Sequence, residues 1–225
     1  MAWKPVIILT ALAVTGCGAD DPPTAEQLAE RLITVDTFDG DWTDNAPPEA
    51  ADGLVPEEFQ EMLPRMDLCD AASDASRAAV LDQRWAAFRQ LDLDVEDPIR
   101  PPDDRTGHLV FVQEFLTSGP ASDLEATFGL LRDGMVACLG DIPAGEEGPG
   151  FAVEMIVPDI GDERYGVLTT IEEAGGWAEW RLHSVMVRDG DVLAVIVITD
   201  IRADSEPYYS IDDVGEMVTT ALALP

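Results

Sequence analysis

Lysine is almost absent from this sequence, and histidine and cysteine are rare. Among 225 residues there are 45 acids, 13 basic residues and two histidines, and Lys4 is the single lysine. The formal net charge is −32. A field of this sign repels nucleic acid and anionic lipid head groups, so we expect neither as a partner surface. Cation binding and adaptation to high salt remain open explanations, beside a plain solvated acidic surface in an arginine-preferring composition.

The sequence also lacks an apolar run long enough to span a bilayer. The stretch from Val6 to Val14 is shorter than the ~20 residues that a membrane-spanning helix needs. Residues 1–16 have a basic start, an apolar middle and a small-residue end, which is typical of a secretory signal. We therefore expect a leader at residues 1–16, a short tether at 17–23 and one extracytoplasmic domain at 24–225.

The expected leader ends at Val14-Thr15-Gly16-Cys17, which resembles the bacterial lipobox. The resemblance implies cleavage just before Cys17 and attachment of acyl chains such as palmitate to that residue. Two acyl chains hold a protein stably on a bilayer. The prediction is a domain anchored through lipid on the outer face of the cell membrane. A plain secretory signal with an incidental Cys17 is the alternative.

Three cysteines leave little room for cysteine chemistry. With Cys17 lipidated, Cys69 and Cys138 remain as an even pair. Exported compartments are oxidising, so we predict a disulfide between these two residues; two buried free thiols are the alternative. The sequence has no CxxC spacing and no Cys/His cluster, so we expect neither a metal site nor a cofactor.

Signatures of catalysis are missing as well. The sequence contains no GxSxG, SxxK or HExxH motif and no glycine-rich phosphate loop. His108 falls in a strand context, as does His183, and a strand histidine is usually a packed side chain. Acid pairs such as Glu172-Glu173 and Asp103-Asp104 are expected by chance among 45 acids. No catalytic residue is therefore predicted.

What the sequence does contain is a succession of helices and strands. Capping boxes begin at Thr24 and Ser122, and a final capped helix starts at Ser210. Helical spacing of apolar residues also predicts a helix over residues 75–90. Alternating patterns predict strands at residues 109–117, 151–157, 164–172, 179–188 and 191–201. Strands in series joined by short turns favour an α+β domain, with a mainly antiparallel sheet of about five strands, helices packed on it and one disulfide.

The last two strands form a predicted hairpin around Asp189-Gly190, a pair that suits a type I′ turn. With that turn, position 188 faces 191 and position 183 faces 196. The strand over residues 191–201 is apolar on both sides, which is typical of a central strand covered by helices on both faces. One face could instead line an apolar cleft, with Arg181 and His183 as polar groups at its edge. These two residues are the candidate ligand-binding site.

Three segments carry a family resemblance: LITVDTFDGDW at 32–42, MVACLG at 135–140, and VMVRDGDVLAVIVITD at 185–200 followed by a helix. Together they resemble actinobacterial exported sensor-domain-containing lipoproteins, which are similar to the extracellular sensor domain of the mycobacterial kinase H type. The resemblance implies a sheet with a cleft, braced by disulfides. The sensor domain of that kinase has two such bridges, whereas this chain has cysteines for one. A kinase domain is missing here, so direct kinase signalling does not carry over.

The expected function is a lipid-anchored, extracytoplasmic ligand-binding or sensor-like domain of the bacterial envelope that catalyses no reaction. Its expected partners are the membrane, through Cys17, and either a small apolar or amphipathic ligand or another envelope protein. One alternative is an envelope hydrolase, which would need two facing carboxylates with one raised pKa. Another is a structural partner in an envelope complex, which would show an exposed apolar patch and no pocket.

Overall fold

The computed structural model describes residues 21–45, 85–93, 109–142, 149–172, 179–202 and 209–222. Cys17, Cys69 and His108 lie outside these ranges, so the predictions made for them stay predictions. The described part holds no helix long and apolar enough to cross a membrane.

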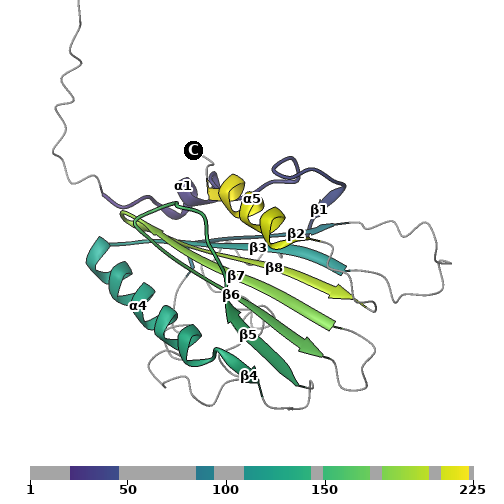
Figure 1. The fold of residues 1–225 in the computed structure, drawn as a ribbon. Coiled ribbons are helices and arrows are strands. Elements are labelled where there is room, and N and C mark those ends of the chain that lie inside the picture. The colour runs from purple at the N-terminus through teal and green to yellow at the C-terminus, as the bar shows by residue number, and fades with distance from the viewer. Residues whose placement is uncertain are drawn as a thin grey trace, which may run out of the picture.

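The described residues form one eight-stranded sheet in which every neighbouring pair is antiparallel, with the order β1-β2-β3-β8-β7-β6-β5-β4 (Figure 1). The strands are β1 (Trp42–Asp44), β2 (Ala87–Leu93), β3 (Leu109–Ser118), β4 (Gly140–Ile142), β5 (Gly150–Glu154), β6 (Glu163–Glu172), β7 (Glu179–Asp189) and β8 (Val192–Arg202). The prediction of about five strands is therefore wrong. The five predicted strands are present as β3, β5, β6, β7 and β8, and β1, β2 and β4 were missed.

The missed strands are short or were assigned to other elements. β1 and β4 have three residues each, too few for an alternating pattern to show. β2 begins at Ala87, inside the stretch predicted to be helical up to Gln90. Its residues pair with β3 over seven positions, so sheet pairing overrides the local apolar spacing there.

Within the described ranges three helices flank the sheet: α1 (Ala25–Ala29), α4 (Ala121–Ala137) and α5 (Ile211–Leu222). Figure 1 shows α4 along one face and α1 and α5 over the other. Thr24 closes the predicted capping box with Gln27, and Ser210 caps α5 by exchanging hydrogen bonds with Asp213. The capping box predicted at Ser122 is wrong, because α4 starts two residues earlier than that box requires, with Pro120 at its N-cap and no side-chain cap.

Apolar side chains are buried on both faces of the sheet. On the α4 face, Phe115, Met186 and Val195 pack against the apolar residues that α4 turns to the sheet, which are Leu124, Phe128, Leu131 and Met135. On the α5 face, Val185, Ile196 and Ile198 pack against the apolar residues that α5 turns to the sheet, which are Val214, Met217, Val218 and Ala221. β8 therefore runs through the centre of the sheet and is covered on both sides, as its uninterrupted apolar sequence predicted.

The β7–β8 hairpin has a different turn from the one predicted. Asp189 pairs with Val192 and His183 pairs with Ile198, so the two turn residues are Gly190 and Asp191. Gly190 has a φ of +58°, and among the described residues no residue other than glycine has a positive φ. A type I′ turn needs two positive φ values, whereas a type II′ turn needs one, at a glycine in first position. The register moves by two residues, so each side chain keeps its predicted face.

Of the two cysteines in the expected disulfide, Cys138 is described and Cys69 is not. Cys138 ends α4, packs against the α4-face core and is in the disulfide-bonded state. Neither of the other two cysteines is described, so no disulfide joins two described residues. The pairing of Cys69 with Cys138 stays a prediction.

Candidate ligand-binding cavity

A cavity of about 450 Å³ lies on the α5 face of the sheet, beside the β7–β8 turn. Its apolar walls come from β3, β7, β8, α5 and the loop before β6, and consist of Leu116, Ile160, Val187, Val192, Ala194, Ala221 and Leu222. Its polar lining consists of Arg31, Glu114, Asp189 and Asp191. A cavity of this size, mostly apolar and with few polar groups, is the usual form of a small-molecule site.

Glu114 is the buried polar group of this cavity. The residue is 1% exposed, and its Oε2 accepts a hydrogen bond of 2.7 Å from the backbone N–H of Ile33. Burial raises the pKa of the Glu114 carboxyl from 4.5 to about 8, while the Ile33 N–H and the charge of Arg89 lower it only in part. Glu114 is therefore mostly protonated at pH 7 and presents a neutral carboxyl group to the cavity.

Arg31 is the cationic group of the cavity. It lies two positions before Ile33, the residue that binds Glu114, so α1 and the segment after it bring both side chains to the same wall. The other arginines with described side chains form ion pairs with acids, namely Arg89, Arg132, Arg164, Arg181 and Arg188. Arg31 forms no ion pair with any described acid, although acids greatly outnumber bases in this chain.

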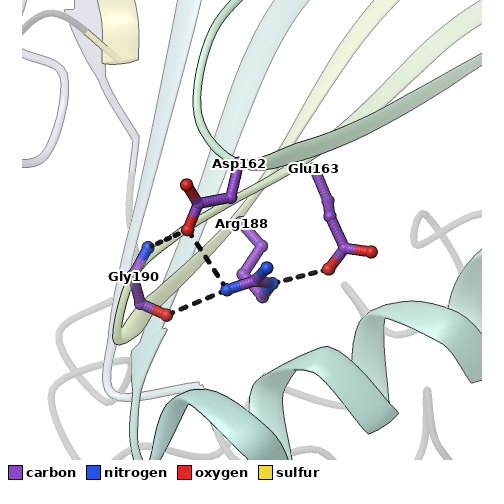
Figure 2. A network of polar contacts seen from close by, with 4 residues as sticks. All are labelled: Asp162, Glu163, Arg188 and Gly190. Carbon is purple, nitrogen blue, oxygen red and sulfur yellow. Dashed lines mark hydrogen bonds and ion pairs between the residues drawn. The ribbon is translucent and has the colours of Figure 1, made fainter.

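The cavity wall at the β7–β8 turn is fixed by a polar network (Figure 2). Arg188 donates from Nε to Glu163 Oε2 at 2.6 Å and from Nη1 to Asp162 Oδ2 and the Gly190 carbonyl, both at 3.3 Å. Asp162 Oδ2 also accepts from the Gly190 N–H at 3.0 Å. The hydrogen bond to Glu163 raises the pKa of Arg188. The network ties the turn to the start of β6, so the residues around the turn have a fixed position.

Gly161 allows the loop before β6 to lie close to β7. Its φ is +63°, and an added Cβ would come within 2.5 Å of Val187 Cγ1 and 2.6 Å of the Arg188 carbonyl oxygen. Any other residue would therefore push the loop away from β7. Since Gly161 and its neighbour Ile160 line the cavity, this close approach forms part of the wall.

The two sequence-predicted ligand residues share the α5 face of β7 but do not line this cavity. Arg181 is partly buried and forms an ion pair with Glu179 at 2.5 Å. His183 is 4% exposed, and its Nδ1 has no hydrogen-bond partner in the described part of the chain. Burial, together with the charge of Arg181, lowers the pKa of His183 from 6.5 to about 4. His183 is thus a neutral buried side chain, and a ligand-binding role for this pair stays a prediction.

A second, shallower hollow of about 270 Å³ lies between α5 and the segment before β1. It is lined by Phe38, Tyr209 and Met217 beside the acids Asp39, Asp213 and Glu216. Asp213 already caps α5 through Ser210, so one of its acids has a structural role. Within the described residues no group of three metal-ligating side chains comes together.

Glu114 and Arg31 were not predicted as site residues. For Glu114 the sequence does hold a signal, because LVFVQEFLT places a charged residue in the middle of a strand that is otherwise apolar on that face. For Arg31 there is none, because an arginine at the end of a short helix has nothing unusual about it. Its place in the cavity depends on how the segment after α1 crosses the sheet.

The structure thus defines an antiparallel sheet domain with helices on both faces and an acid-containing cavity on one of them. No family model matches the chain, and no curated protein matches its sequence. Among solved structures it is similar to the extracellular domain of PknH from Mycobacterium tuberculosis, with a TM-score of 0.38 and 13% identity over 80% of this chain and 96% of that one. The sequence resemblance named the extracellular sensor domain of this type of kinase. A likeness of this degree establishes neither a shared ligand nor a shared activity.

Proposed function

We propose that this chain is a lipid-anchored, extracytoplasmic domain that binds a small amphipathic molecule in the cavity around Glu114 and catalyses no reaction. The observation that carries the proposal is the buried carboxyl group of Glu114 in a cavity with apolar walls, whose other charged lining residues are Arg31, Asp189 and Asp191. Burying a polar group without full hydrogen bonding costs free energy, so its presence there calls for a role. Contact with the polar end of a ligand would supply the missing partner.

The position of the cavity relative to the expected anchor supports an amphipathic ligand. The carbonyl of Pro23 accepts a hydrogen bond from Ser118 at 2.5 Å, which fixes the start of the domain next to the end of β3. Cys17 precedes Pro23 by six positions, and a fully extended chain covers ~3.3–3.6 Å per residue. A lipid on Cys17 would therefore keep this end of the domain within roughly 20 Å of the bilayer. Molecules that partition into the membrane would be concentrated near the cavity.

A hydrolase is the second candidate, because the raised pKa of Glu114 is one of the two features that it requires. The other feature is a facing carboxylate. Glu114 pairs with Ile196, which pairs with Val185, and Asp189 lies four residues further along β7. Standard sheet spacings place the two backbones about 10 Å apart across the strands and about 13 Å apart along them. Carboxyl pairs in glycosidases lie ~5–9.5 Å apart, and among the described residues no carboxylate acts on the pKa of Glu114, so the arrangement favours binding over hydrolysis.

The test of the proposed function is to fill the cavity. Val192 lines it and is only partly buried, so Val192→Phe should place a ring in the cavity with little loss of stability. Ligands co-purifying with the full chain would be extracted and identified by mass spectrometry, and thermal shifts would be measured with envelope lipid extracts. We expect the original chain to co-purify with a ligand or to show a thermal shift with the extracts. The Val192→Phe variant should have an affinity for that ligand at least tenfold lower.

The matched control is Val153→Phe. Val153 is a strand valine that is 37% exposed and does not line the cavity. This variant should bind as the original chain does. Equal ligand binding by all three proteins would contradict a role for the cavity, and so would the absence of any ligand or thermal shift.

A further inference from the structure

The polar lining of the cavity indicates which end of an amphipathic ligand would meet it. Glu114, as a neutral carboxyl group, has an O–H to donate, and the one hydrogen bond that described residues give this side chain ends on its Oε2. Arg31 has a guanidinium group with five N–H donors and no ion pair with a described acid. Both residues therefore bring hydrogen-bond donors to the same cavity.

The remaining charged residues of the cavity limit the charge of the ligand's head group. Asp189 is exposed and Asp191 is partly buried, and both line the cavity at the β7–β8 turn. These two acids and the net charge of −32 disfavour a polyanion such as a phosphate monoester. A single carboxylate matches one guanidinium and one neutral acid.

We infer that the cavity binds an amphipathic monocarboxylic acid, with its carboxylate held by Arg31 and Glu114 and its aliphatic part against the walls formed by β3, β8 and α5. The inference rests on the proposed function and specifies the ligand class. Arg31 supplies a charged, bidentate contact to the carboxylate. Glu114 supplies a hydrogen bond from its neutral form, and Leu116, Val192 and Ala194 cover the chain next to it.

Binding of this kind would depend on pH. Once Glu114 ionises, its charge repels the ligand carboxylate. The charge that acts on Glu114 is that of Arg89, its cross-strand neighbour on β2. Arg31 from the segment after α1 and Asp189 and Asp191 from the hairpin line the same cavity, and α5 contributes only apolar residues to it. With the pKa of Glu114 at about 8, affinity should fall about tenfold from pH 7 to pH 9.

The experiment is calorimetric titration of the full chain with octanoate, octan-1-ol and octylamine, which share one aliphatic chain and differ in head group. We expect octanoate to bind at least tenfold more tightly than the other two at pH 7. Arg31→Gln should lose at least tenfold for octanoate and leave octan-1-ol unchanged. The matched control is Arg132→Gln, because Arg132 lies on α4 outside the cavity and pairs with Asp133. It should bind octanoate normally.

Glu114→Gln separates a head-group contact from a structural role. Its amide can still donate a hydrogen bond, so octanoate affinity at pH 7 should stay within about threefold, whereas the loss between pH 7 and 9 should vanish. Octan-1-ol binding that is blocked by Val192→Phe, together with no preference for octanoate, would overturn this inference and keep the proposed function. Tighter binding of octylamine would overturn it in the same way. Failure of all three probes, with no ligand in the extracts, would overturn both.

Discussion

At the residue scale, Glu114 is the side chain with the largest consequences. It lies between Arg89 on β2 and Ile196 on β8, and the Ile33 N–H holds one of its oxygens. Its surroundings are apolar enough to keep the carboxyl neutral at pH 7, which sets it apart from the exposed acids that dominate the surface. The same burial links its proton to the stability of the fold.

The first residue-scale prediction concerns stability against pH. Because the folded pKa of Glu114 is about 8 and the ordinary value is 4.5, the folded state holds this proton over that interval while the unfolded state releases it. The contribution of Glu114 to stability is therefore fully present below pH 4.5 and is lost as pH rises toward 8, with a slope of at most about 1.4 kcal/mol per pH unit. Glu114→Gln should remove this contribution, so the stability of the original chain relative to Glu114→Gln should fall as pH rises from 4.5 to 8, as urea unfolding at a series of pH values would measure. His183, whose pKa is lowered to about 4, contributes a slope of opposite sign that is the same in both proteins.

Glu216→Gln is the control for this measurement, because Glu216 is exposed on α5. It should leave the pH dependence between 4.5 and 8 unchanged. If the original chain and Glu114→Gln have parallel stability curves over this interval, Glu114 is ionised in the folded protein and the account of the cavity given above is wrong.

At the scale of elements, the helix N-termini show which helix starts are determined by local sequence and which by tertiary packing. α1 and α5 begin after capping residues that the sequence predicts, which are Thr24 and Ser210. α4 has a similar signal at Ser122, yet it begins at Ala121 after Pro120. Its four buried residues pack on the sheet, so tertiary contacts rather than a cap stabilise its position.

A pair of serine substitutions tests this difference. Ser210→Ala removes the side chain that accepts from the Asp213 N–H at 3.2 Å, and we expect a loss of about 1 kcal/mol in the free energy of unfolding. Ser122→Ala should cost less than about 0.5 kcal/mol, because the Ser122 hydroxyl bonds only to the neighbouring Asp123 side chain. Chemical denaturation measures both. A larger loss at Ser122 than at Ser210 would contradict the observed caps.

At the scale of the whole molecule, two properties dominate: a sheet covered on both faces and a large excess of negative charge. The sheet places α1 and α5 on the face that holds the cavity and α4 on the other (Figure 1). The excess charge of −32 acts on every part of the surface and opposes the compact state through self-repulsion.

Screening this repulsion should stabilise the protein. We expect the free energy of unfolding to rise by roughly 1 kcal/mol between 10 mM and 500 mM salt, because the Debye length shortens from ~30 Å to under 8 Å. Sodium chloride and choline chloride should have the same effect if screening is the cause. A rise with sodium chloride alone would indicate specific cation binding instead, and no change would contradict self-repulsion.

The sequence alone determined the elements with regular patterns. Alternation located β3, β5, β6, β7 and β8, and the apolar run of residues 191–201 correctly predicted a central strand covered on both faces. On α4 and on α5, four apolar residues at helical spacing form the side that packs against the sheet. Each of these patterns lies within one short segment and reflects directly which side chains are buried. The order of residue types in the sequence is therefore enough to recognise them.

The tertiary structure alone decided the number of strands and the composition of the cavity. β1 and β4 exist because longer neighbours offer them hydrogen bonds, and Ala87–Leu93 is a strand because β3 pairs with it. Arg31 and Glu114 are far apart in the chain and line the same cavity because the segment after α1 is bound to β3 through the Ile33 N–H. The protonation state of a carboxyl group depends on all the groups around it. In this fold those groups come from segments that are far apart in the sequence, so no local pattern predicts them.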